Sequence, residues 1–219
     1  MKPTPKTYLY KLSYNDGRAP CAPEPKPGSQ PLLTLALCKP AIRRTAVEGD
    51  RILGVTSQSL AQSKGYPLHA VIYAAIVSGS LEASEYYAPR SPFRSRPDCV
   101  YQFNRQDGSF THRGDPAVRN SPIFFRRDLG GAGSYKNARI LLSHDFRYFS
   151  PDPIPIPNRF HELHDLIEPL HQGHRVNHPA SRERELDALF RSLWKLPTRY
   201  TPSVIGNDPK PNKSGTSTC

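Results

Sequence analysis

The chain has 219 residues, of which 37% are hydrophobic, and it contains 24 prolines. Globular domains average about 45–50% apolar residues and about 5% proline, so this chain is poor in apolar residues and rich in proline. Its 30 lysines and arginines outnumber its 19 acidic residues, which gives a formal net charge of +11. Such a surplus favours polyanionic partners, namely nucleic acid, nucleotides or an anionic membrane surface.

Three sequence patterns exclude other classes of protein. The longest apolar run, at 70–77, is far shorter than the roughly 20 residues that a membrane helix needs. The first residues contain no apolar core of a secretory signal. The four cysteines (Cys21, Cys38, Cys99 and Cys219) are scattered without a C-x-x-C, which argues against a zinc ribbon or a disulfide framework. We therefore expect a soluble, reduced, cytoplasmic protein with no membrane partner.

Taken in chain order, the sequence predicts a flexible N-terminus at 1–5, a single domain at 6–197 and a disordered C-terminal tail at 198–219. Two strand-like runs, 7–13 and 32–38, open the domain. The proline-rich segment between them is expected to be an extended loop, because each proline fixes φ and removes a donor.

A short helix at 41–47 is predicted next, because Pro40 suits the first turn of a helix and Gly49 can end it. A strand at 51–56 follows. The continuous apolar run at 68–78 predicts a strand buried on both faces or in a barrel wall.

The rest of the domain combines short strands with helices at the end. Strands are expected at 98–103 and 137–143, another possible strand at 122–126, and helices at 159–170 and 181–196. This order predicts an α+β fold with a small curved sheet or a partly closed β-barrel, short inserted helices and two C-terminal helices.

Lys39, Arg43 and Arg44 form a basic cluster at the start of the first predicted helix. The forked donors of a guanidinium suit phosphate or a base edge, and a helix N-terminus adds affinity for anions. The alternative is that these side chains are simply solvated on a surface helix.

Six of the eight histidines lie between 144 and 178. His161, His164 and His171 fall on one face of a predicted helix, the arrangement that a metal site needs. No H-E-x-x-H is present, the stripe borders the apolar face, and Pro169 interrupts it. We expect no metal and no cofactor.

Aromatic and basic residues alternate at 143–150. If this segment is extended, His144, Phe146 and Tyr148 share one face of a strand. Aromatic side chains beside cations can stack bases and hold phosphates, although one aromatic face packed in the core is an equal alternative. The glycine-rich segment 130–133 lacks the ending of a phosphate loop and predicts a flexible turn.

Three segments carry a resemblance to a known family. They are Cys38-Lys39-Pro40-x-Ile42-Arg43-Arg44 followed by Gly49-Asp50, the LLSHDFRYF run at 141–149, and Gly173-His174-Arg175. With these segments the chain resembles the second of the nucleotide-modification-associated domain families, over about residues 7–195. Such domains occur in phages and bacteria, often near genes for modified DNA bases. The strand–helix–strand element and Tyr86-Tyr87 also look like PUA-like, EVE and ASCH domains, small barrels that hold a base in an aromatic pocket. The serine and proline-rich run after 149 departs from the first family's pattern.

The resemblance implies a module that binds a nucleic acid, DNA more than RNA, or a nucleotide, and that recognises a modified base or assists a modification enzyme. An enzyme of base or nucleotide modification using His174 and Arg175 as catalytic residues is the alternative, as is a nonspecific DNA-contacting partner in a phage or defence complex. The expected binding residues are Lys39, Arg43, Arg44, Asp50, Tyr86, Tyr87, His144, Phe146, Tyr148, His174 and Arg175.

Overall fold

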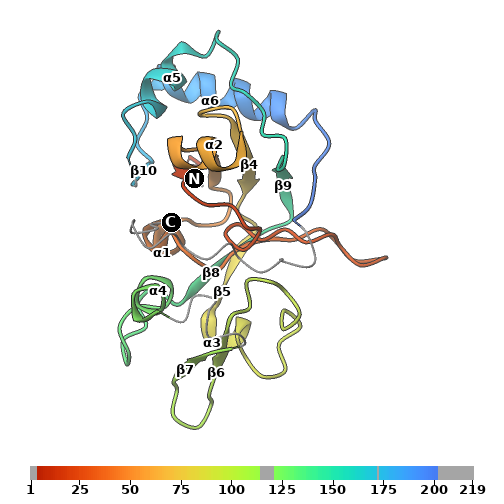
Figure 1. Ribbon diagram of the computed structural model, residues 1–219, viewed down its shortest axis with the longest axis vertical. Coiled ribbons are helices and arrows are strands. Elements are labelled where there is room, and N and C mark those ends of the chain that lie inside the picture. Colours follow the sequence, from red (N-terminus) through yellow and green to blue (C-terminus); the bar gives the residue numbers. More distant parts are fainter. Residues whose placement is uncertain (1–3, 114–120, 172, 202–219) are drawn as a thin grey trace.

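The protein is described by a computed structural model that covers residues 4–113, 121–171 and 173–201. Figure 1 shows an elongated molecule with helices α5 and α6 at one end of its long axis and strands β6 and β7 at the other. None of the helices in these described ranges is long and apolar enough to cross a membrane.

The larger sheet has five strands in the order β10-β1-β3-β4-β9. The strands are β1 (Thr7–Leu12), β3 (Arg51–Thr56), β4 (Val71–Ile76), β9 (Asp145–Tyr148) and β10 (His174–Arg175). Strands β1 and β3 are parallel, and the other neighbours are antiparallel. Alternation along β1 directs Tyr8, Tyr10 and Leu12 to one face and Leu9 to the other.

Two smaller sheets extend the molecule. One contains β2 (Leu33–Leu35), β8 (Arg139–Ser143) and β5 (Gly79–Glu82), in that order, and the other pairs β6 (Tyr101–Phe103) with β7 (Phe110–His112). Strands β8 and β9 join the first small sheet to the large one. These open sheets form no closed barrel, so the curved-sheet prediction is confirmed and the partly closed barrel is not observed.

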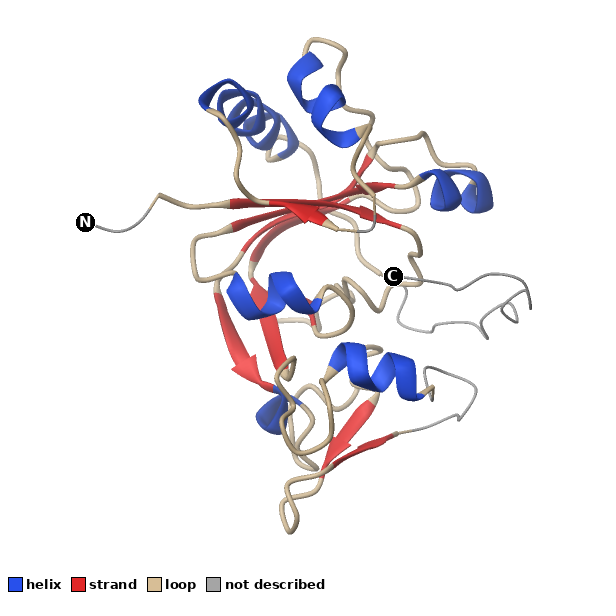
Figure 2. Ribbon diagram, turned by 90° about the vertical axis from the view of Figure 1, so that its left-hand side faces the viewer, coloured by secondary structure: helices blue, strands red, loops and turns tan. Residues whose placement is uncertain are grey.

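The helices are α1 (Pro40–Thr45), α2 (Gln58–Lys64), α3 (Ala83–Tyr86), α4 (Pro122–Asp128), α5 (His161–Ile167) and α6 (Ala180–Leu193). Helices α5 and α6 cover one face of the large sheet, and α1 lies on the other (Figure 2). A third apolar cluster, around Tyr86, Tyr87 and Tyr101, forms the core beneath β6 and β7.

One local prediction was wrong, and one conditional expectation holds only for part of its segment. The possible strand at 122–126 is helix α4, which begins where the Ser121 hydroxyl accepts from the Ile123 N–H and Pro122 occupies the first turn. The segment 143–150 is not one strand, because His144 interrupts it between β8 and β9. In the segment 122–126, the short apolar run after the capping serine is compatible with a helix or a strand, and tertiary packing decides between the two.

Residues 198–201, assigned above to the tail, pack against the body of the protein. Thr201 is buried, donates its N–H to the Ala22 carbonyl at 2.8 Å and accepts from the Ala22 N–H at 3.1 Å. Tyr200 packs on the first core cluster. The rest of the predicted tail, 202–219, and residues 1–3 lie outside the described residues.

Candidate functional site

Strand β1 brings together two segments that lie far apart in the sequence. Lys39 immediately precedes α1, and His174 begins β10. His174 is the antiparallel partner of Tyr10, so both side chains project from the same face of the sheet. The Lys39 Nζ atom lies 4.5 Å from the centre of the Tyr10 ring, and the His174 ring lies 5.8 Å from that of Tyr8. These four residues are called the Lys39–His174 site below.

The backbone that carries Lys39 has an unusual conformation. Cys38 and Lys39 have φ values of 58° and 43°, in the left-handed region. Residues other than glycine visit this region at a cost of about 1–2 kcal/mol each. The surroundings hold the turn on both sides, because the Cys38 N–H donates to Asp128 Oδ1 at 2.8 Å and its carbonyl accepts from Arg43 Nε at 2.8 Å.

Arg43 is fully buried and has a structural role. Besides Cys38, its guanidinium donates to the carbonyl oxygens of Asn137, Arg139 and Asp128 at 2.6–2.7 Å. Burial lowers the pKa of Arg43, and the nearby Asp128 carboxylate opposes this effect. The expected phosphate contact of Arg43 is therefore replaced by contacts to the protein's own carbonyls, which leave no room for a ligand.

His174 is half-buried beside a positive charge. Burial lowers the pKa of His174, and the Lys39 ammonium lowers it further. The imidazole is consequently neutral at pH 7, while Lys39 supplies the positive charge. Lys39 also donates to the Lys11 carbonyl at 3.4 Å.

The cavity beside Lys39 is small. It is lined by Tyr10, Tyr14, Asp16 and Lys39 among others and has a volume of about 10 Å³. This space admits about one water molecule and not a nucleobase. Any ligand of the Lys39–His174 site larger than one water molecule would therefore lie outside this cavity.

Four of the expected polar residues lie elsewhere. Arg44 is exposed on α1 and donates to Asn137 Oδ1. The buried Asp50 carboxylate accepts from the backbone N–H groups of Lys6 and Val47 and so ties down a loop. Arg175 pairs with Leu9, which places it on the opposite face from His174. His144 is exposed, with Nδ1 2.9 Å from the Pro31 carbonyl oxygen.

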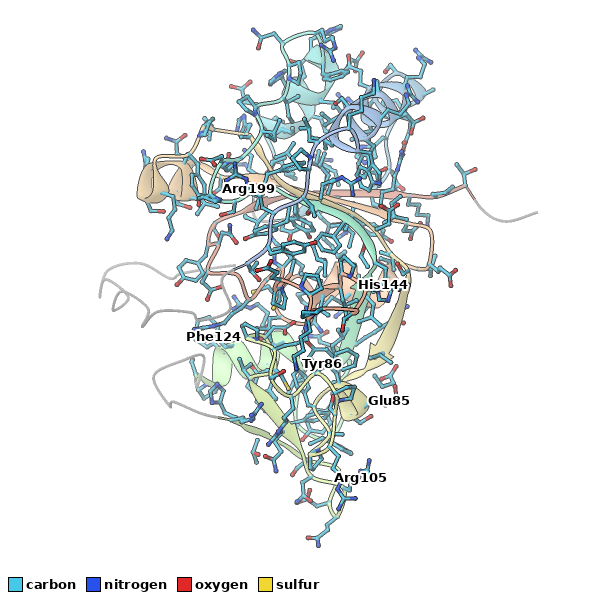
Figure 3. All side chains as sticks on the ribbon, turned by 90° about the vertical axis from the view of Figure 1, so that its right-hand side faces the viewer. Glu85, Tyr86, Arg105, Phe124, His144 and Arg199 are labelled. Carbon is cyan, nitrogen blue, oxygen red and sulfur yellow. The ribbon has the colours of Figure 1, made fainter. Side chains whose placement is uncertain are left out.

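The four aromatic residues expected to stack a base are core residues. Tyr86, Tyr87, Phe146 and Tyr148 are each at most 2% exposed. Figure 3 labels Tyr86 together with Glu85, the exposed residue that precedes it on α3. No base can stack on rings that are covered by protein on all sides, so the alternative of an aromatic core is the one that the structure has.

The histidine stripe has no geometry for a metal. Within the described ranges, no group of three His, Cys, Asp or Glu side chains is placed to hold an ion. His161 instead lies 3.7 Å from a carboxylate oxygen of Glu185. Cys21, Cys38 and Cys99 are buried free thiols.

Sequence reasoning missed Tyr8, Tyr10 and Asp128. The two tyrosines alternate along a predicted strand and could have been assigned to one face, but nothing in the sequence shows that His174 pairs with this strand. Asp128 follows a segment with an ambiguous pattern, and its contact with Cys38 spans 90 positions. Neither contact has a local signal.

Comparison with known protein families gives one match. The family model described as nucleotide modification associated domain 2 matches residues 4–203, which include Cys38, Lys39 and His174. Neither a curated protein nor a solved structure matches the chain. Since the family model covers most of the chain, the protein belongs to the nucleotide modification associated domain 2 family.

Proposed function

We propose that this protein binds a phosphate group of a nucleic acid or nucleotide at the Lys39–His174 site. The observation that carries this proposal is the convergence of Lys39 and His174, from two family motifs, on one face of β1. The protein's net charge of +11 would attract the same polyanions from a distance.

The chemistry of the pair suits an anion. The Lys39 ammonium is only partly exposed, so water and salt screen its charge less than they would at a fully exposed site. The neutral His174 ring can donate one N–H, and it can take up a proton when an anion arrives. The left-handed turn at Cys38 and Lys39 fixes the backbone from which the Lys39 side chain projects. The contacts of the ammonium with the Tyr10 ring and the Lys11 carbonyl would place it in advance, which reduces the entropy that binding costs.

In the cell, the protein would recognise a modified base or assist a modification enzyme in the cytoplasm. We favour DNA over RNA because the resemblance described above points to modification of DNA bases. A contact to phosphate alone positions a nucleic acid without reading its sequence. Recognition of a modified base would therefore require a second contact.

Binding to short DNA duplexes, with and without a modified base, at two salt concentrations tests this proposal. Lys39→Ala and His174→Ala are expected to weaken binding, and Lys39→Ala should also reduce the salt dependence by about one counterion. Lys64→Ala, at an exposed lysine on α2, is the matched control. Equal binding by all variants would refute the assignment of the site, and equal binding of modified and unmodified duplexes would refute base recognition.

A catalytic role for His174 is the second candidate, favoured by its lowered pKa. A neutral imidazole can accept a proton from a substrate, and the neighbouring Lys39 can stabilise the resulting anion. Arg175 lies on the other face of the sheet and has no part in this version. Turnover of DNA or nucleotides that rises with pH through the His174 pKa and disappears in His174→Ala would support it, and absence of turnover would rule against it.

A further inference from the structure

We infer that a second site, between α4 and the β6–β7 pair, binds one nucleotide unit, with its base in an aromatic pocket and its phosphate on Arg126 and Arg127. This inference shares only the chemical class of its ligand with the proposed function. The pocket is lined by Tyr101, His112, Ser121, Pro122, Phe125, Arg126 and the segment 130–132. Its volume is about 370 Å³, within the range of small-molecule sites.

The aromatic rings of this pocket are fixed before any ligand binds. The Tyr101 hydroxyl donates to Asp128 Oδ2 at 3.0 Å. Its ring meets Phe125 and His112 edge to face, at centroid distances of 5.6 and 5.7 Å. Tyr101 is itself fully buried and forms the floor of the pocket, so a planar base would stack on the partly exposed rings of Phe125 and His112, which Tyr101 holds in place. Such stacking contributes about 1–3 kcal/mol per base.

A second hollow adjoins the pocket and is basic. It is lined by Pro122, Ile123, Arg126 and Arg127, has a volume of about 490 Å³, and shares Pro122 and Arg126 with the aromatic pocket. No carboxylate lines either hollow among the described residues. A ligand with a flat ring and an attached anion would match this pair of hollows.

Arg127 provides an independent indication of an anion. Its Nε and Nη2 atoms are buried without a hydrogen-bond partner among the described residues. The carboxylate oxygen Asp128 Oδ1 lies 3.9 Å from Nε, too far to accept a hydrogen bond. The guanidinium is held 4.8 Å from the Phe124 ring centre. Buried donors without acceptors are costly, so a movement of the Arg127 side chain that brings these two atoms to a phosphate oxygen would be favourable.

The two candidate sites share one carboxylate. Asp128 accepts from the Cys38 N–H through one oxygen and from the Tyr101 hydroxyl through the other. The turn that carries Lys39 and the floor of the aromatic pocket are therefore held by the same side chain.

Calorimetric titration of the full chain with the four 2′-deoxynucleoside 5′-monophosphates, the matching nucleosides and inorganic phosphate tests the inference. The monophosphates should bind more tightly than either part alone. Arg126→Ala and Arg127→Ala should each weaken monophosphate binding about 10-fold or more, as expected for a charge-assisted hydrogen bond. Arg105→Ala, at the distal tip of the molecule, is the control and should change nothing (Figure 3). Thermal unfolding checks that each variant is folded.

NMR locates the bound probe and separates the two proposals. Monophosphate should shift the amide resonances of Gly130 and Gly131, which line the pocket. A loss of binding in Lys39→Ala alone would overturn this inference and leave the proposed function standing. Equal affinity for phosphate and nucleotide, or no binding by any probe at millimolar concentration, would also overturn it. A short single-stranded oligonucleotide that binds much more tightly, with the same sensitivity to Arg126→Ala, would identify the source as a strand.

Discussion

The Nε atom of Arg43 donates to the carbonyl oxygen of Cys38 at 2.8 Å, across five positions of the same motif. This bond runs from the helix back to the left-handed turn before it, so one residue of the motif fixes the conformation of another. A buried arginine and a partly exposed lysine thus have separate tasks, since Arg43 holds the turn and Lys39 presents its charge.

Removal of the Arg43 guanidinium is expected to destabilise the protein strongly. Arg43→Met keeps most of the volume but leaves four carbonyls without this donor, three of them in fully buried contacts. We expect a loss of about 3–5 kcal/mol in the free energy of unfolding, measured by urea denaturation. Arg44→Ala, one position later on the exposed face, should cost less than about 1 kcal/mol. If Arg43→Met does not fold, Arg43→Lys should be intermediate, and equal effects at 43 and 44 would contradict this role.

The pKa of His174 is expected to report the charge of Lys39. In the wild type, an NMR titration should place it below the ordinary value of about 6.5, and Lys39→Ala should raise it part of the way back, since burial remains. His69, whose pKa is also lowered but which feels Lys11 and not Lys39, is the control in the same spectra. An unchanged His174 titration in Lys39→Ala would show that the two groups do not interact.

The direction of the pH effect follows from this shift. Because the folded state binds the His174 proton less readily than the unfolded state, His174 lowers stability as the pH falls from about 6.5 through its folded pKa. A bound phosphate has the opposite effect, since it favours the protonated ring. The affinity for a DNA phosphodiester, whose own charge does not change in this range, should therefore increase over the same descending pH range, and His174→Ala should abolish the increase. If the affinity of the wild-type protein for this ligand did not change with pH, His174 would be excluded from the site.

Local patterns predicted much of the fold, and long-range contacts account for what they missed. The strands at 7–13 and 51–56 were predicted because their apolar and β-branched residues have a strong local signal. Lys39 and His174 were both candidates, but their neighbourhood depends on the pairing of β10 with β1. The burial of Tyr86 and Arg43 could not be predicted, because a tyrosine or arginine on a short helix has the same sequence signature in a core and on a surface.

Tyr86 and Tyr87 are expected to respond in opposite ways to the loss of a hydroxyl. Both are fully buried, but the Tyr86 hydroxyl donates to Asp98 Oδ1 at 2.7 Å, whereas that of Tyr87 has no hydrogen-bond partner among the described residues. Tyr86→Phe should cost about 1–3 kcal/mol because it leaves a buried carboxylate short of a donor. Tyr87→Phe should be neutral or stabilising, because it removes an unsatisfied polar atom. Urea denaturation of the two variants is the measurement, and equal losses would contradict the hydrogen-bond assignment.

Gly54 is expected to be essential for packing within the large sheet. A Cβ at this position would overlap the Tyr73 ring and lie 2.6 Å from Leu12 Cδ1. The Tyr73 hydroxyl is 2.8 Å from that of Tyr10, so Tyr73 cannot move away without breaking this contact under the Lys39–His174 site. Gly54→Ala should therefore lower the free energy of unfolding by about 1–3 kcal/mol, as overpacked cores do. Gly173→Ala is the matched control, because nothing lies within 4 Å of its added Cβ, and it should be neutral or slightly stabilising. A Gly54→Ala variant as stable as this control would show that the β3–β4 region repacks freely and that the position of Tyr10 does not depend on Tyr73.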